Sequence, residues 1–222
     1  SRGMVMAHAV LARGAKSGGR PTRQEAEHRM KRLLEIAQRH FLAAGYRETS
    51  IDSIIREAGI AKKTLYHHFG GKAGLFTAIV ETLRRSWIAE LSDIVLGPSR
   101  PEQVLEAVAL HLLDVGTRRE MIELHRLFLV EAHRFPDFAR GNYEKDGSAR
   151  GMEPLSSYLR GAVAEGALEI DDVALATEQF TSLVLGGIRE RLLFGAARRP
   201  SASERNLIAR QAVRIFLAGC SA

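Results

Sequence analysis

Apolar residues recur every three or four positions along most of the chain, which is the period of an amphipathic α helix. Gly45 directly follows the first stripe, and a glycine at such a place is typical of a left-handed cap that ends a helix. The pattern therefore predicts one long helix over residues 22–44. Its apolar face comprises Met30, Leu33, Leu34, Ala37, Phe41 and Ala44.

Two short amphipathic segments come next along the chain. Ser50 is the expected N-cap of the first segment, and the pair Ala58-Gly59 ends it. The second segment covers residues 62–69. Gly70-Gly71 separates it from a fourth helix, which Lys72 opens.

The rest of the chain predicts more helices and shows no convincing strand alternation. The expected helices cover residues 101–117, 119–134, 147–165, 172–194 and 203–217, with turn residues between them. The predicted fold class is therefore all-α. Residues 1–22 are expected to form a flexible arm, because they combine several glycines with basic residues and have no helical pattern.

Positive charge is concentrated at the N-terminal end of the chain. Residues 1–72 contain 14 Lys or Arg and 6 Asp or Glu, a net charge of +8. Residues 73–222 contain 18 and 20, a net charge of −2, so that the whole chain carries +6. A basic module on a near-neutral body favours a polyanion such as nucleic acid as partner, although a merely soluble basic face would have the same composition.

The remaining composition argues against a membrane protein and against a disulfide scaffold. Apolar residues make up 45% and charged residues 26% of the chain, which is an ordinary globular balance. No apolar run approaches the ~20 residues that a membrane-spanning helix needs. Cys220 is the single cysteine and has no partner within the chain. These features lead us to expect a cytoplasmic protein with no membrane partner.

The stretch over residues 49–75 carries the functional prediction. Two short helices joined by the tight Ala58-Gly59 turn match the helix-turn-helix plan, whose second helix enters the major groove of DNA. Donors, cations and aromatics are left on or near the outer surface, where they suit phosphates and base edges. These residues are Lys62, Lys63, Thr64, Tyr66, His67 and His68.

The same stretch resembles the DNA-binding domain of TetR-type transcriptional regulators. The residues that match the family pattern are Thr49, Ser50, Ile51, Ile54, Ala58, Gly59, Ile60, Thr64, Leu65, Tyr66, His68, Phe69, Lys72 and Leu75. Four positions depart from it. Ser53 and Ala61 lack the side chains that would complete two helix caps, Ile55 enlarges the core, and Lys63 adds charge at the DNA face. None of these departures contradicts DNA binding.

The resemblance implies a role for each matching polar side chain. Ser50, at a helix N-terminus, and Lys72 would bind phosphates, and Tyr66 and His68 would contact the sugar-phosphate backbone. Two alternatives stay open, namely Tyr66 as a half-buried core aromatic and Lys72 as a solvated lysine. The candidates for base edges are Lys62, Lys63, Thr64 and His67.

The N-terminal arm offers one further contact. Arg20 lies between Gly19 and Pro21, and such an arginine either enters a narrow minor groove or belongs to a disordered tail. The expected organisation is thus a flexible basic arm over residues 1–22, a helix-turn-helix domain over residues 23–72, and a ligand-binding and dimerisation domain over residues 73–222.

The larger domain resembles the AefR-like type of C-terminal domain within the same family. The resemblance implies a homodimer that reads a near-palindromic operator through its two helix-turn-helix domains. The spacing of these domains would change when an unknown small molecule binds between helices. Candidate cavity residues, each of which could be plain core, are Trp87, Met121, His125, Phe128, Tyr158 and Phe180. The last two helices should form the interface through Phe180, Leu183, Val184, Gly187, Ile188, Ile208 and Phe216.

The main prediction is a sequence-specific DNA-binding regulator, a repressor that a small ligand releases from its operator. An enzyme is not expected, because only Glu25-x-x-His28 has the spacing of a di-metal helical bundle and no nucleophile or phosphate-loop motif is present. No cofactor or metal is expected either. The alternative is a TetR-like, DNA-bound adaptor that recruits a protein partner and senses no small ligand. An open, well-lined cavity would count against that alternative.

Overall fold

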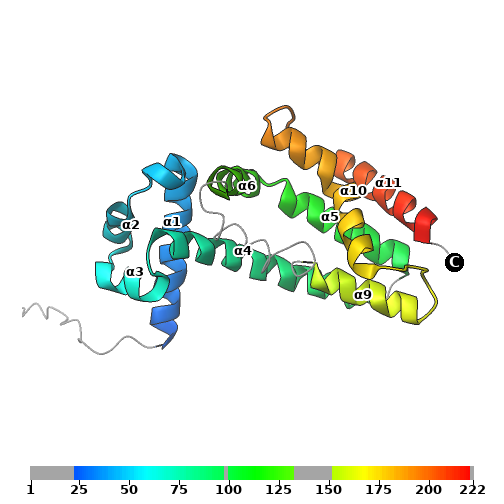
Figure 1. The fold of residues 1–222 in the computed structure, drawn as a ribbon, viewed down its shortest axis with the longest axis horizontal. Helices are drawn as coiled ribbons and strands as arrows, with labels where there is room; N and C mark the ends of the chain where they lie inside the picture. The colour runs from blue at the N-terminus through cyan, green and yellow to red at the C-terminus, as the bar shows by residue number, and fades with distance from the viewer. Residues whose placement is uncertain (1–22, 98–99, 133–151, 221–222) are drawn as a thin grey trace, which may run out of the picture.

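The computed structural model describes residues 23–97, 100–132 and 152–220. Within these ranges the chain forms helices and no strand, which confirms the all-α prediction. Figure 1 shows α1, α2 and α3 at one end of an elongated molecule, α10 and α11 at the other end, and α4 running between them. The helices are α1 (Arg23–Glu48), α2 (Ile51–Ala58), α3 (Lys62–Phe69), α4 (Lys72–Val95), α5 (Pro101–Gly116), α6 (Arg119–Ala132), α9 (Glu153–Ala164), α10 (Val173–Leu193) and α11 (Ala202–Cys220). None of these helices is both long and apolar enough to cross a membrane.

The two short helices begin and end where the sequence predicts. α3 covers residues 62–69, and Ser50 is the N-cap of α2, where its hydroxyl accepts a hydrogen bond from the N–H of Ser53. Gly59 ends α2 in the left-handed conformation, with φ 66° and ψ 36°. Ala61 precedes α3 without a side-chain cap, as its missing hydroxyl leads one to expect.

The end of the first helix differs from the prediction. Gly45 has φ 79° and ψ 169°, which is an extended backbone with positive φ and not a left-handed helical cap. α1 therefore kinks at Gly45 and continues for a short turn to Glu48. Thr49 closes the kink, because its buried hydroxyl donates a 2.6 Å hydrogen bond to the carbonyl of Gly45. Glycine suits this position because other residues rarely adopt such a positive φ.

A small hydrophobic core holds the N-terminal helices together. The ring of Phe41 on α1 stacks on Tyr46, with centroids 5.6 Å apart, and meets Phe76 of α4 edge to face at 5.4 Å. Ile54 of α2 and Leu65 of α3 are fully buried in the same cluster. The orientation of the two short helices is thus set by contacts with α1 and α4.

α4 connects this core with the rest of the molecule. Leu75, Phe76 and Ile79 near its start belong to the N-terminal core, which also includes Leu124 of α6. Leu91 near its other end belongs to a second, larger core. Because each end of one helix is packed into a different core, a shift of α4 acts on both.

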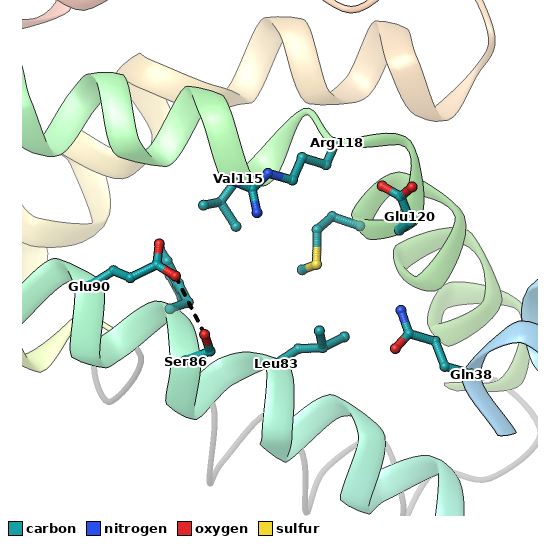
Figure 2. Close-up of a pocket in the computed structure, with 9 residues that line it drawn as sticks. Gln38, Leu83, Ser86, Glu90, Val115, Arg118 and Glu120 are labelled. Atoms are coloured by element: carbon teal, nitrogen blue, oxygen red, sulfur yellow. Dashed lines mark hydrogen bonds between the residues drawn. The ribbon is translucent and has the colours of Figure 1, made fainter. Parts of the chain in front are cut away.

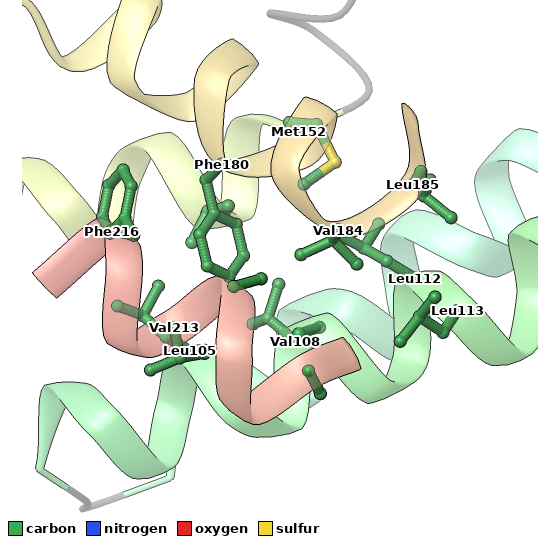
Figure 3. Close-up of a cluster of buried hydrophobic side chains, with 14 of the residues drawn as sticks. Leu105, Val108, Leu112, Leu113, Met152, Phe180, Val184, Leu185, Val213 and Phe216 are labelled. Atoms are coloured by element: carbon green, nitrogen blue, oxygen red, sulfur yellow. The ribbon is translucent and has the colours of Figure 1, made fainter. Parts of the chain in front are cut away.

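The larger core lies among α5, α9, α10 and α11. Figure 3 shows Phe180 of α10 and Phe216 of α11 within it, and their ring centroids are 5.0 Å apart in an edge-to-face arrangement. Leu105 and Val108 of α5 are fully buried there. Outside this core, Arg126 of α6 donates hydrogen bonds to two carbonyls at the end of α10, which fixes α6 against that helix.

Candidate nucleic-acid interface

The outer face of α3 carries the side chains that the sequence assigns to DNA. Leu65 is fully buried in the N-terminal core, whereas the six predicted residues around it are exposed. Tyr66 is 46% exposed and does not belong to the N-terminal core cluster, and its contact with the sugar-phosphate backbone stays a prediction. The exposed set is Lys62, Lys63, Thr64, Tyr66, His67 and His68.

The two lysines at the start of α3 have different surroundings. The ammonium of Lys62 lies 3.0 Å from the carboxylate of Asp52 on α2, and this hydrogen bond raises the pKa of Lys62. Lys63 has no ion-pair partner among the described residues. Because Asp52 balances the charge of Lys62, Lys63 supplies the unpaired ammonium of this turn.

The last turn of α3 presents two imidazoles to the surface. The rings of His67 and His68 are 5.3 Å apart between centroids and meet edge to face. Each ring nitrogen that carries a proton can donate a hydrogen bond to a phosphate or to a base edge. The polar groups of α3 thus extend over its whole length, from Lys62 to His68.

Lys72, at the first position of α4, is bound within the protein. Its ammonium donates a 2.8 Å hydrogen bond to the carbonyl of Arg47 and lies 5.0 Å from the centroid of the Tyr46 ring. These contacts hold the start of α4 against the turn that follows Gly45. The alternative of a freely solvated lysine is therefore wrong, and the phosphate contact of Lys72 stays a prediction.

Two further residues complete the predicted DNA-binding set. Ser50 is exposed at the N-terminus of α2, where its hydroxyl accepts a long, 3.4 Å hydrogen bond from the N–H of Ser53. Arg20 lies outside the described residues. The structure thus presents Ser50 at the surface and provides no position for Arg20.

An exposed ionic network fixes α2 on α1. Glu57 of α2 accepts hydrogen bonds from Arg39 at 2.6 Å and from Nε2 of His40 at 2.7 Å. The hydrogen bond from His40, followed by the one from Arg39, lowers the pKa of the Glu57 carboxyl. Exposed ion pairs stabilise a protein little, so this network orients the helices more than it strengthens the domain.

Gly74 positions the interface, and the sequence analysis did not single it out. A Cβ atom at Gly74 would lie 1.8 Å from the carbonyl oxygen of Phe69, the last residue of α3. The missing side chain thus allows α4 to start directly against the end of α3. The available signal was a third glycine after Gly70-Gly71, but a helical pattern does not reveal which neighbour a glycine approaches.

A cavity of about 220 Å³ lies behind this interface, between α1, α4, α5 and α6 (Figure 2). Of the six predicted cavity residues, Trp87 and Met121 line it. The other lining residues are Gln38, Leu83, Ser86, Glu90, Val115, Arg118 and Glu120.

The four other predicted cavity residues do not line this space, and their part in ligand binding stays a prediction. Phe180 is fully buried in the larger core, and Tyr158 packs against the same core. Phe128 packs against the N-terminal core. His125 is partly buried, and its burial lowers the pKa of its imidazole. Large side chains with helical spacing fill the cores of this protein because each of them buries more apolar surface than a small side chain would.

α10 and α11 present an apolar face to solvent at the far end of the molecule. On α10, Leu175 is 50% and Leu183 is 42% exposed, and on α11, Leu207 is 63% and Ile215 is 48% exposed. A groove of about 510 Å³ includes Leu183, Ile215 and Gly219. Exposed apolar patches of this kind are typical of interaction surfaces.

The predicted interface residues divide between this face and the interior. Leu183 and Gly187 are exposed, and Ile208 is partly buried. The others are buried in the subunit's own core, which corrects the prediction that they face a partner; they are Phe180, Val184, Ile188 and Phe216. Leu175, Leu207 and Ile215 are further exposed apolar residues of these two helices.

Comparisons with known proteins agree with this arrangement. A family model described as bacterial regulatory proteins of the tetR family matches residues 33–79, and one described as the C-terminal domain of AefR-like transcriptional repressors matches residues 103–220. The regulator SrpR of Pseudomonas putida is 25% identical over 175 residues, which is 78% of this chain and 79% of SrpR.

Solved structures share the fold. A TetR-family regulator from Mesorhizobium loti MAFF303099 is 26% identical, with a TM-score of 0.81 over 91% of this chain and 100% of its own. The flavonoid-responsive regulator FrrA is 27% identical, with a TM-score of 0.65 over 88% of this chain and 98% of its own. Both matches span the N-terminal and the larger helical parts together.

Proposed function

The chain belongs to the TetR family of DNA-binding transcriptional regulators. From this premise we propose that it is a repressor that leaves its operator when a small molecule occupies the cavity beside α4. One observation carries the proposal, namely that α4 reaches from the helix-turn-helix core to the larger core and lines the cavity on the way. An occupied cavity would displace α4 and with it the end of α3.

The surface of α3 supports sequence-specific DNA binding. Its exposed side chains combine the unpaired ammonium of Lys63 with the hydroxyl of Tyr66 and two imidazoles. Such groups bind phosphates without regard to sequence and read base edges when the helix lies in the major groove. Lys62 would take part after it leaves Asp52 or while it bridges Asp52 and a phosphate.

A homodimer would give this short helix its specificity. Two copies related by a two-fold axis read two half-sites, so a near-palindromic operator follows from the symmetry of the protein. The apolar face with Leu183 and Ile215 is the surface that best suits such contact.

The adaptor alternative has less support. It requires a surface for a protein partner and no occupied cavity, whereas the chain has a cavity that α4 shares with three other helices. The relative FrrA is described as flavonoid-responsive, which places a small-molecule response among similar proteins. We therefore favour the ligand-released repressor.

The direct test is the selection of binding sites from random double-stranded DNA with the purified protein. We expect an enriched near-palindrome, because a dimer reads two equivalent half-sites. Retention of DNA that depends only on salt, with no enriched sequence, would contradict specific recognition.

We expect Lys63→Ala to weaken operator binding by roughly 5- to 100-fold, because a lysine that reads a base edge contributes about 1–3 kcal/mol of discrimination. The measurement is a fluorescence-anisotropy titration with the selected operator and with an unrelated duplex. Lys31→Ala, which removes an exposed lysine of α1, is the matched control. It should change the affinities for the two duplexes by similar amounts, and by less than Lys63→Ala changes the affinity for the operator. Equal losses of Lys63→Ala on both duplexes would mean that Lys63 contacts phosphates only.

We expect Leu183→Glu to shift the protein toward monomers, because the carboxylate would be buried against apolar side chains of a second copy. Operator affinity should decrease as dimerisation weakens, because a single subunit contacts only one half-site. Analytical ultracentrifugation measures the shift. Leu96→Glu is the control, because Leu96 is 79% exposed at the C-cap of α4 and belongs to neither α10 nor α11. A dimer of Leu183→Glu as stable as the control would exclude this face as the interface.

A further inference from the structure

The cavity beside α4 has apolar walls and acidic groups on two sides. Leu83, Trp87, Val115 and Met121 contribute apolar or aromatic surface. Figure 2 shows Glu90 of α4 and Glu120 of α6 on opposite sides of the open space, with Val115 above it and Leu83 below it. A ligand in this space would therefore lie between two carboxylates.

Arg118 is the one cationic side chain among the described residues that line the cavity, and an acid outside the lining holds it. Arg118 donates a 2.6 Å hydrogen bond to the carboxylate of Asp114. This bond is the largest of the influences that lower the pKa of Asp114, so the acid is ionised at neutral pH. Arg118 is thus held by Asp114, which also accepts a 2.7 Å hydrogen bond from Arg199 and so shares one negative charge between two guanidiniums.

The two acids, by contrast, have no strong cationic partner in the described residues. Glu120 has no ion-pair partner there. Glu90 accepts a weak 3.4 Å hydrogen bond from Ser86, and Nδ1 of His111 lies 3.7 Å from its carboxylate. Burial lowers the pKa of His111, so its imidazole is neutral at pH 7 and does not balance Glu90. The charged side chains among the described lining residues are thus two carboxylates and one guanidinium, which gives the lining a net negative charge.

We propose that this cavity binds a small organic cation with an apolar or aromatic body, and that this cation is the effector of the proposed function. The two carboxylates attract the positive charge, and Trp87 places an aromatic ring in the lining, which a cation–π contact requires. The apolar part of the ligand removes Leu83, Val115 and Met121 from water. An anion would instead meet the carboxylates of Glu90 and Glu120, and repulsion disfavours it.

The same cavity provides a route from the ligand to DNA. Its lining comes from α1, α4, α5 and α6, and α1 and α4 also form the core beneath α3. A ligand that separates α4 from α6 would move the start of α4, where Gly74 adjoins the end of α3. The effector class and the release of DNA are thus linked by one helix.

Trp87 makes the proposal directly measurable, because it is the single tryptophan of the chain. We would titrate the DNA-free protein with benzyltrimethylammonium and follow the fluorescence of Trp87. Neopentylbenzene has the same shape without the charge, and phenylacetate carries the opposite charge. We expect a saturable change with the cation at a concentration at least ten-fold below that needed for either other compound.

Variants of the acids identify the source of selectivity. Glu90→Gln and Glu120→Gln should each weaken binding of the cation by roughly five-fold and leave binding of neopentylbenzene unchanged. Glu102→Gln is the control, because Glu102 is an exposed acid in the first turn of α5, whereas Val115 places the cavity near the other end of that helix. Circular dichroism would check that each variant is folded.

The outcomes separate this proposal from the proposed function. No saturable change with the cation, or equal binding of its neutral isostere, would overturn the cation proposal. Operator binding is scored separately by anisotropy without any ligand, so a protein that binds no operator contradicts the repressor and not the ligand class. Cation binding that leaves the operator complex intact would retain the cavity as a cation site and reject its role as effector site.

Discussion

Replacing Gly74 by alanine is expected to destabilise the helix-turn-helix domain by about 3 kcal/mol, the upper part of the usual range for overpacking. The new Cβ would lie 1.8 Å from the carbonyl oxygen of Phe69 and 2.9 Å from its carbonyl carbon. Both are backbone atoms, so no side chain can rotate away and the end of α3 has to move. Because α3 presents the side chains that we propose to bind DNA, operator affinity should fall together with stability.

Thermal unfolding and an anisotropy titration with the selected operator measure the two effects of Gly74→Ala. Gly161→Ala is the matched control, because Gly161 lies within α9 and a Cβ there meets nothing within 4 Å. The control should be stabilised by about 0.5–1 kcal/mol, since alanine favours a helix more than glycine does. A Gly74→Ala protein with unchanged unfolding temperature and unchanged affinity would refute the role assigned to this contact.

Replacing Phe180 by alanine is expected to cost about 3–5 kcal/mol of the free energy of unfolding, as large aromatic truncations in cores do. Phe180 is fully buried, and its ring meets Phe216 edge to face at a centroid distance of 5.0 Å. Its removal leaves a cavity between α10 and α11 and loosens the two helices that carry the exposed apolar face. Dimerisation should weaken as a consequence.

Urea unfolding at two protein concentrations distinguishes these effects, because only the dimer contribution depends on concentration. Phe194→Ala is the control of the same residue type, since Phe194 is 78% exposed at the C-cap of α10. It should change the stability of the subunit by less than about 0.5 kcal/mol. Similar losses for both variants would mean that Phe180 does not have the core role that its burial indicates.

Helical periodicity predicted the elements well because it depends on neighbours along one helix. α2 and α3 have the predicted bounds, and the DNA-facing side chains of α3 are exposed as expected. Gly45 shows where such patterns stop being sufficient. A positive φ was foreseeable from glycine, but its ψ of 169° depends on the turn that Thr49 closes with the Gly45 carbonyl.

The candidate cavity and the interface were less predictable. Phe180, Phe128 and Tyr158 were cavity candidates because they are large and apolar, yet each packs in or against a core. Glu90 and Glu120, which define the charge of the cavity, lie on helices that come together only in the folded chain. Polar residues on a helix have the same pattern whether they face a cavity or solvent.

The sequence by itself determined the helices, the basic N-terminal module and the family motif from which the DNA-binding side chains are predicted, because these depend on periodicity, charge and fixed spacing. Only the tertiary structure decided that Lys62 pairs with Asp52, that Lys72 binds the Arg47 carbonyl, and that Leu183 rather than Phe180 faces outward. Each of these depends on which side of a helix another helix covers. That choice is made by packing between segments far apart in sequence, which no local pattern records.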